Sequence, residues 1–73
     1  MSMNFLGRLA ASGLPYETRD HGEIEHILIL QAAQLVRADV PRQVGDAYEG
    51  SATVWELTPD GRTALALAAR QKP

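Results

Sequence analysis

The absence of cysteine from a chain of 73 residues limits how its fold can be held together. A domain of this size buries only about 60% of the surface that its unfolded chain exposes, so its apolar core is thin. Small domains with such a core often gain stability from disulfides, a metal ion or a second subunit. The length predicts one domain over residues 1–73. Because disulfides are excluded, a metal ion, a partner or good helix packing is left to stabilise it.

Composition and charge exclude several classes of protein. Hydrophobic residues make up 45% of the chain, as in ordinary globular domains, and the formal net charge is −2. Domains that bind nucleic acid on their own usually carry a basic excess. No stretch approaches the roughly 18 apolar residues that a membrane span needs, so we expect no membrane contact. Arg8 interrupts the first apolar segment, which does not match a secretory signal, and we expect a cytoplasmic location.

The first 22 residues predict a helix followed by a polar turn. Phe5, Leu6 and Leu9 form one apolar stripe at helical spacing, which predicts a helix over residues 3–12. Gly13 suits the left-handed conformation at its end, and Pro15 follows as a stop signal. Residues 16–22 are polar and are expected to form a turn.

The most apolar run, residues 24–36, predicts a second helix. The block over residues 27–30 is apolar all round, so periodicity alone does not exclude a buried strand over residues 25–30. A helix is favoured because good helix formers continue the run as far as Gln34. Residues 35–40 end at Pro41 and predict an edge strand or the end of a strand, and the composition of residues 42–51 predicts a loop.

The last third of the chain predicts a strand followed by a helix. Residues 52–57 are rich in β-favouring types, and strict alternation would turn Trp55 and Leu57 toward the core. Thr58 is a good N-cap, and Pro59 fits the first helical position. Asp60 would lie near the positive end of the helix dipole. The helix is expected to end near residue 71.

Two segments resemble winged-helix regulators. Residues 54–62 read VWELTPDGR and are similar to the second wing strand and following helix of the PadR and MarR groups. Residues 30–37 read LQAAQLVR and resemble the end of a recognition helix entering the first wing strand. The resemblance, over roughly residues 24–70, implies a small α+β, winged-helix-like domain with about three helices and a short antiparallel β-hairpin. It also implies that Arg37 and Arg42 lie on the wing side, where nucleic acid would be contacted.

Three features depart from that family. Gln34 stands where the family usually has glycine, and residues 13–33 are few for two full helices. The segment 17–25 carries four carboxylates, and Arg19 is its only permanent cation. Carboxylates at this edge would repel the phosphates of DNA, so the acidic segment disfavours nucleic-acid binding.

Residues 20–26 are the densest polar cluster and hold the candidates for a metal site. On a helix His21 and Glu25 are four residues apart and Glu23 and His26 are three apart, and such pairs can reach one metal ion. Neither an HExxH motif nor a cysteine accompanies them, and we favour an ordinary solvated helix start, with no metal and no cofactor. No nucleophile elbow or phosphate-binding loop occurs, and we expect no enzyme activity.

These observations favour a non-catalytic binding module. The partner is expected to be another protein or a second copy of the chain, because association would bury what a thin core leaves exposed. Phe5 and Leu6 on the apolar N-terminal helix and Tyr48 in a polar loop are the interface candidates. The alternative is a small DNA-binding transcriptional regulator that uses Arg37 and Arg42.

Overall fold

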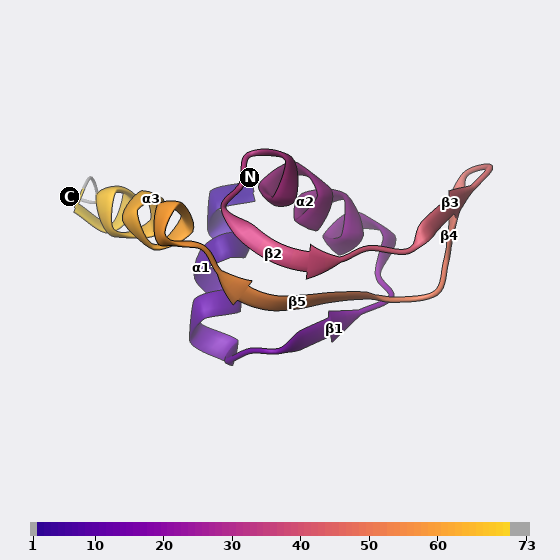
Figure 1. The fold of residues 1–73 in the computed structure, drawn as a ribbon, viewed down its shortest axis with the longest axis horizontal. Coiled ribbons are helices and arrows are strands. Elements are labelled where there is room, and N and C mark those ends of the chain that lie inside the picture. Colours follow the sequence, from indigo (N-terminus) through magenta and orange to yellow (C-terminus); the bar gives the residue numbers. More distant parts are fainter. Residues whose placement is uncertain (1, 71–73) are drawn as a thin grey trace.

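Three helices and five short strands make up the part of the chain that the computed structural model describes, namely the backbone of residues 2–70 and the side chains of residues 4–70. Along the chain (Figure 1), these elements are α1 (Ser2–Ser12), β1 (Tyr16–Thr18), α2 (His21–Ala32), β2 (Val36–Asp39), β3 (Arg42–Val44), β4 (Ala47–Glu49), β5 (Ala52–Leu57) and α3 (Pro59–Arg70). The predicted α+β class, with three helices and an antiparallel β-hairpin, is confirmed.

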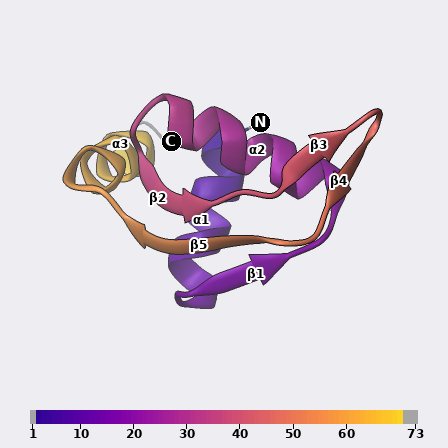
Figure 2. The same cartoon turned by 45° about the vertical axis from the view of Figure 1, so that its right-hand side comes forward.

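The strands form two antiparallel sheets, one of three strands with β5 in the middle and one of two strands. The larger sheet has the order β1-β5-β2, so β2 is an edge strand, as predicted. Strands β3 and β4 form a separate hairpin that extends β2 and β5 away from the body (Figure 2). The expected turn at residues 16–22 and loop at residues 42–51 were therefore wrong in part. Strands of three residues carry too little alternation to be recognised, and pairing with a neighbour defines them.

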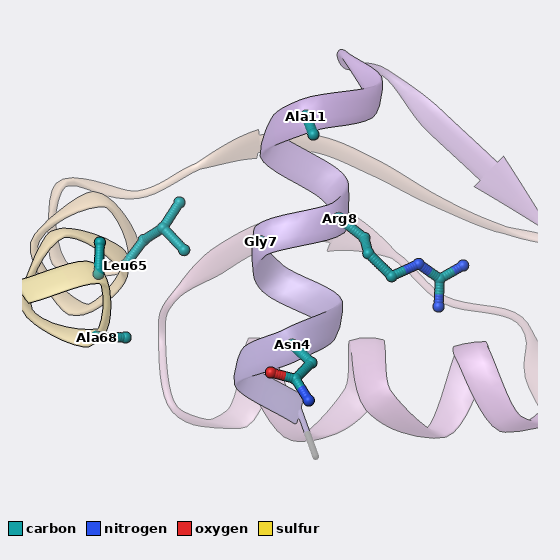
Figure 3. Close-up of a pocket in the computed structure, with 7 residues that line it drawn as sticks. Asn4, Gly7, Arg8, Ala11, Leu65 and Ala68 are labelled. Carbon is teal, nitrogen blue, oxygen red and sulfur yellow. The ribbon is translucent and has the colours of Figure 1, made fainter. Parts of the chain in front are cut away.

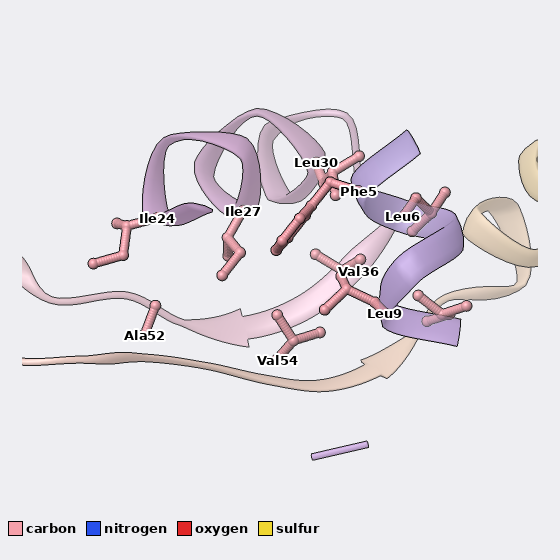
Figure 4. Close-up of a cluster of buried hydrophobic side chains, with 10 residues drawn as sticks. Phe5, Leu6, Leu9, Ile24, Ile27, Leu30, Val36, Ala52 and Val54 are labelled. Atoms are coloured by element: carbon pink, nitrogen blue, oxygen red, sulfur yellow. The ribbon is translucent and has the colours of Figure 1, made fainter. Parts of the chain in front are cut away.

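The core lies on one side of the sheet, between its inner face, α1 and α2 (Figure 4). Its buried members from the helices and strands are Phe5, Leu6, Leu9, Ile24, Ile27, Leu30, Val36, Ala52, Val54 and Leu57. Residues 25–30 are helical, which settles the alternative that the sequence left open. The proposed interface role of Phe5 and Leu6 is corrected, because both side chains are buried inside their own domain.

A β-bulge in β5 corrects the predicted orientation of Trp55. Val54 lies opposite Ala38 and Glu56 lies opposite Arg37, so Trp55 is an extra residue between two paired positions. One inserted residue shifts the alternation of a strand. Leu57 is therefore buried on the same side as Val54, whereas Trp55 is 53% exposed.

The turn between α2 and β2 holds the start of α3. Gln34 adopts a left-handed conformation with φ of 63°, and the Leu35 N–H donates to the Leu30 carbonyl oxygen at 2.9 Å, as in a Schellman motif. The Thr58 hydroxyl donates to the Gln34 carbonyl oxygen at 2.7 Å and accepts from the Gly61 N–H at 3.0 Å. This confirms Thr58 as the predicted N-cap.

Two glycines have positions that other residues would strain. Gly13, with φ of 88°, ends α1 in the left-handed conformation that the sequence predicts. At Gly61 a Cβ atom would overlap the Leu35 carbonyl group, so only glycine lets α3 approach the turn this closely.

A side chain of α2 also contacts the edge strand β2. Gln31 Nε2 donates to the Ala38 carbonyl oxygen at 2.7 Å.

We expect Gln34→Gly to stabilise the fold by about 0.5–1 kcal/mol. A left-handed conformation costs a residue with a Cβ about 1–2 kcal/mol, and glycine avoids this cost but loses roughly 0.5–1 kcal/mol of backbone entropy. The measurement is urea unfolding followed by tryptophan fluorescence.

Ala33→Gly is the matched control, because Ala33 has a right-handed conformation with φ of −81°. Glycine there gains nothing in the folded state, and we expect it to destabilise the fold by about 0.5–1 kcal/mol. Equal effects of the two substitutions would contradict the role assigned to the Gln34 conformation.

Candidate interaction surfaces

Helix α3 projects from the body and packs mainly against the outer side of α1. At the opposite end of the molecule lies the β3–β4 hairpin (Figure 1), and the overall extents are 40 × 20 × 20 Å. Among the described residues of α3, only Gly61 is buried. Leu65 is half-buried and points toward α1 (Figure 3). Few apolar contacts therefore join α3 to the rest of the domain.

A groove of about 450 Å³ lies between α1 and α3. Its lining residues are mostly small: Asn4, Gly7, Arg8, Ala11, Leu65, Ala68 and Ala69. Those from α1 are spaced i, i+3, i+4 and i+7, which places them on one face of that helix, and this face lies opposite the core stripe. Sequence reasoning missed this surface because it looked for large apolar residues, and the signal here is a face of glycine and alanine.

The two residues predicted to contact nucleic acid, Arg37 and Arg42, are exposed, but α2 does not add a cationic surface to them. Arg37 on β2 lies opposite Glu56, and Arg42 on β3 lies opposite Glu49. The exposed face of α2 carries His21, Glu25 and Ile29, and that helix contains no lysine or arginine. Two arginines with carboxylate residues across the strand do not form a strongly basic patch.

The metal candidates are only partly brought together. His21 Nε2 lies 2.8 Å from Glu25 Oε1, whereas the His26 ring stacks on Phe5, with 5.6 Å between centroids. In residues 4–70 no three His, Cys, Asp or Glu side chains gather as metal ligands would. The His21 ring also lies 4.9 Å from the ring of Tyr48. Tyr48, which the sequence suggested as an interface residue, is therefore half-buried against its own chain.

A polar network joins α1, β1 and α2 beside the core. The Tyr16 hydroxyl donates to Glu23 Oε1 at 2.9 Å, and Arg8 Nη2 lies 3.2 Å from Glu23 Oε2. Hydrogen bonding from the Thr18 hydroxyl lowers the pKa of Glu23 most strongly, followed by the bond from Tyr16. The hydrogen bond from the Tyr16 hydroxyl to the Glu23 carboxylate is also the main reason that the pKa of Tyr16 is raised. The network stabilises the ionised carboxylate and so fastens three elements together.

We expect Glu23→Gln to destabilise the fold by about 1–2 kcal/mol at neutral pH, because the neutral amide loses the charged hydrogen bonds. The pKa of Glu23 is lowered below its ordinary 4.5 in the folded state. The carboxylate therefore stabilises the fold fully above pH 4.5, and this contribution is lost as the pH falls through the lowered pKa. Urea unfolding at neutral and acid pH measures the difference between wild type and variant.

The difference in unfolding free energy between wild type and Glu23→Gln should become smaller in acid. Glu56→Gln, which removes an exposed carboxylate from β5, controls for the loss of one negative charge. A Glu23→Gln effect that stays the same in acid, or that Glu56→Gln reproduces, would contradict the role of the network.

Comparisons with protein-family models, with curated proteins and with solved structures find no match to this chain. Within the described residues, no helix has both the length and the apolar character to cross a bilayer.

Proposed function

We propose that the chain is a small, non-catalytic, winged-helix-like module that acts by contact with other proteins, and that its first partner is a second copy of itself. The exposed surface of α3, with Leu67, and the groove beside it carry this proposal. A cytoplasmic location is part of it, because a chain without cysteine fits a reducing compartment.

The exposed area of the chain supports association. Its accessible surface is 5017 Å². A compact monomer of 7.9 kDa would expose about 4,400 Å². The excess of roughly 600 Å² approaches the roughly 800 Å² that each partner buries in a standard interface. A second copy over α1 and α3 would cover part of the surface that this elongated monomer leaves open.

Small residues along α1 and an exposed leucine on α3 are the features that a second copy would cover. Small residues such as Gly7 and Ala11 leave space along α1, and Leu67 on α3 is 52% exposed. Leu67 lies on the face of α3 away from the groove, and in a twofold dimer this face would have to meet the same face of the second copy. Antiparallel packing of the two α3 helices satisfies this requirement.

We expect the protein to sediment at twice the mass of one chain at high micromolar concentration. Burial of a leucine side chain contributes about 1.5–3 kcal/mol, so Leu67→Lys should weaken dimerisation at least about tenfold. Sedimentation equilibrium over a dilution series measures the dissociation constant.

Ile29→Lys is the matched control, because Ile29 is also a large apolar residue on an exposed helix face, at 56% exposure. It lies on α2, away from the groove, and should leave the dimer intact. A protein that stays monomeric at millimolar concentration would contradict the dimer, as would equal weakening by both variants.

One observation favours the DNA-binding alternative. Helix α2 runs into β2, and β2 is antiparallel to β5 with a hairpin beyond both, which is the order that the resemblance implies. Arg42 is exposed on that hairpin. Against this, the α2 face offers carboxylates where phosphates would approach.

We expect no salt-reversible shifts at Arg37, Arg42 or residues 23–30 when a mixed-sequence DNA duplex is added at low salt to isotopically labelled protein in an NMR titration. The repulsion between the acidic α2 face and the phosphates is the reason. Shifts at those residues that salt reverses and Arg42→Ala abolishes would replace the interaction module with the DNA-binding regulator.

A further inference from the structure

The outer face of the three-stranded sheet is not covered by α1 or α2. Directly paired residues of neighbouring strands point to the same side, so the register defines what this face presents. Glu17 lies opposite Thr53, and Thr53 lies opposite Asp39, which gives one row across all three strands. A second row holds Glu56, which lies opposite Arg37, together with Trp55, the extra residue of the bulge.

Trp55 is the centre of this face and is held in position. Its indole Nε1 donates to Asp39 Oδ2 at 2.9 Å, from β5 to β2. Tryptophan is usually well buried, yet this side chain is 53% exposed. An aromatic ring fixed by a hydrogen bond loses little conformational freedom when a ligand covers it, so this ring is a preorganised contact.

The charge of the face determines which ligand suits it. Glu17, Asp39 and Glu56 provide three carboxylates, and Arg37 is the only cation in the two rows. Guanidinium and ammonium groups are attracted both to carboxylates and to the face of an indole ring. Phosphate groups would be repelled, although nucleic-acid bases also stack on aromatic side chains.

We propose that this face binds an extended basic segment of a partner protein. An arginine or lysine side chain of that segment lies over the Trp55 ring, with its charge beside Asp39, and neighbouring cations approach Glu17 and Glu56. The surface lies on the outer side of the sheet, whereas the groove lies between α1 and α3. The inference therefore goes beyond the proposed dimer and does not depend on it.

The test is a titration with an acetylated peptide of alternating arginine and glycine, followed by tryptophan fluorescence at low salt. Trp55 is the single tryptophan of the chain, so the signal reports this face alone. We expect a saturable change that added salt reverses. A peptide with glutamate in place of arginine, and one with serine, should cause no change.

Two variants separate this site from general attraction between opposite charges. Asp39→Asn keeps an oxygen that can accept the indole hydrogen bond but removes the charge, and it should weaken binding about fivefold or more. Asp46→Asn makes the same chemical change at the exposed end of the hairpin and should alter binding less than twofold. Glu17→Gln, a second change in the same row, should also weaken binding.

Other outcomes would overturn the proposal. Equal weakening by Asp39→Asn and Asp46→Asn would mean attraction to net charge alone. Equal binding of the serine peptide, or of oligothymidine, would assign the face to a ligand without positive charge. No fluorescence change at millimolar peptide would exclude the site. The titration is repeated with Leu67→Lys, so that failure of the dimer and failure of this site are told apart.

Discussion

The one-sided core is the constraint on which the rest of this structure depends. Within residues 4–70 the buried apolar side chains meet between α1, α2 and the inner sheet face, and a chain of 73 residues has few others with which to cover the outer face. The outer sheet face and most of α3 are left without cover, and α3 covers the back of α1 only in part. Both proposed contacts lie on these uncovered surfaces, so they follow from the same shortage of apolar residues that keeps the core thin.

Strand β5 is the element that organises this arrangement. It pairs with β1 and β2 on its two sides, and it leads directly into α3. The bulge at Trp55 allows one short strand to serve two purposes. Leu57 completes the core next to the start of α3, while Trp55 stays on the outer face. Without the extra residue, strict alternation would place these two side chains on the same face.

The parts of the fold that could be predicted are those encoded by neighbouring residues. The Thr58-Pro59 start of α3, the glycine end of α1 and the helical run after Ile24 follow from local propensity, and the structure confirms them. Strand β1 and the β3–β4 hairpin were missed because pairing between distant residues defines them. The orientation of Trp55 was wrong because a bulge depends on the register of two strands, which one strand alone does not reveal.

The candidate surfaces were less predictable than the fold. Phe5 and Leu6 were assigned to an interface for their apolar character, but apolar character also selects the core. The α1–α3 groove depends on small residues, whose importance appears only when two helices are placed side by side. Arg37 and Arg42 are exposed on β2 and β3, and the carboxylate residues across the strand from them could not be predicted because they depend on the register.

The bond from Gln31 to the edge strand has a consequence for the behaviour of this protein in a crowded solution. An unpaired strand edge offers its carbonyl groups to any other extended chain, and such pairing can continue into fibrils. In β2 the carbonyl oxygen of Ala38 already accepts from the Gln31 amide at 2.7 Å. A helix side chain thus occupies one acceptor that an incoming strand would use, which makes this edge a poorer template for pairing while its sheet face stays accessible.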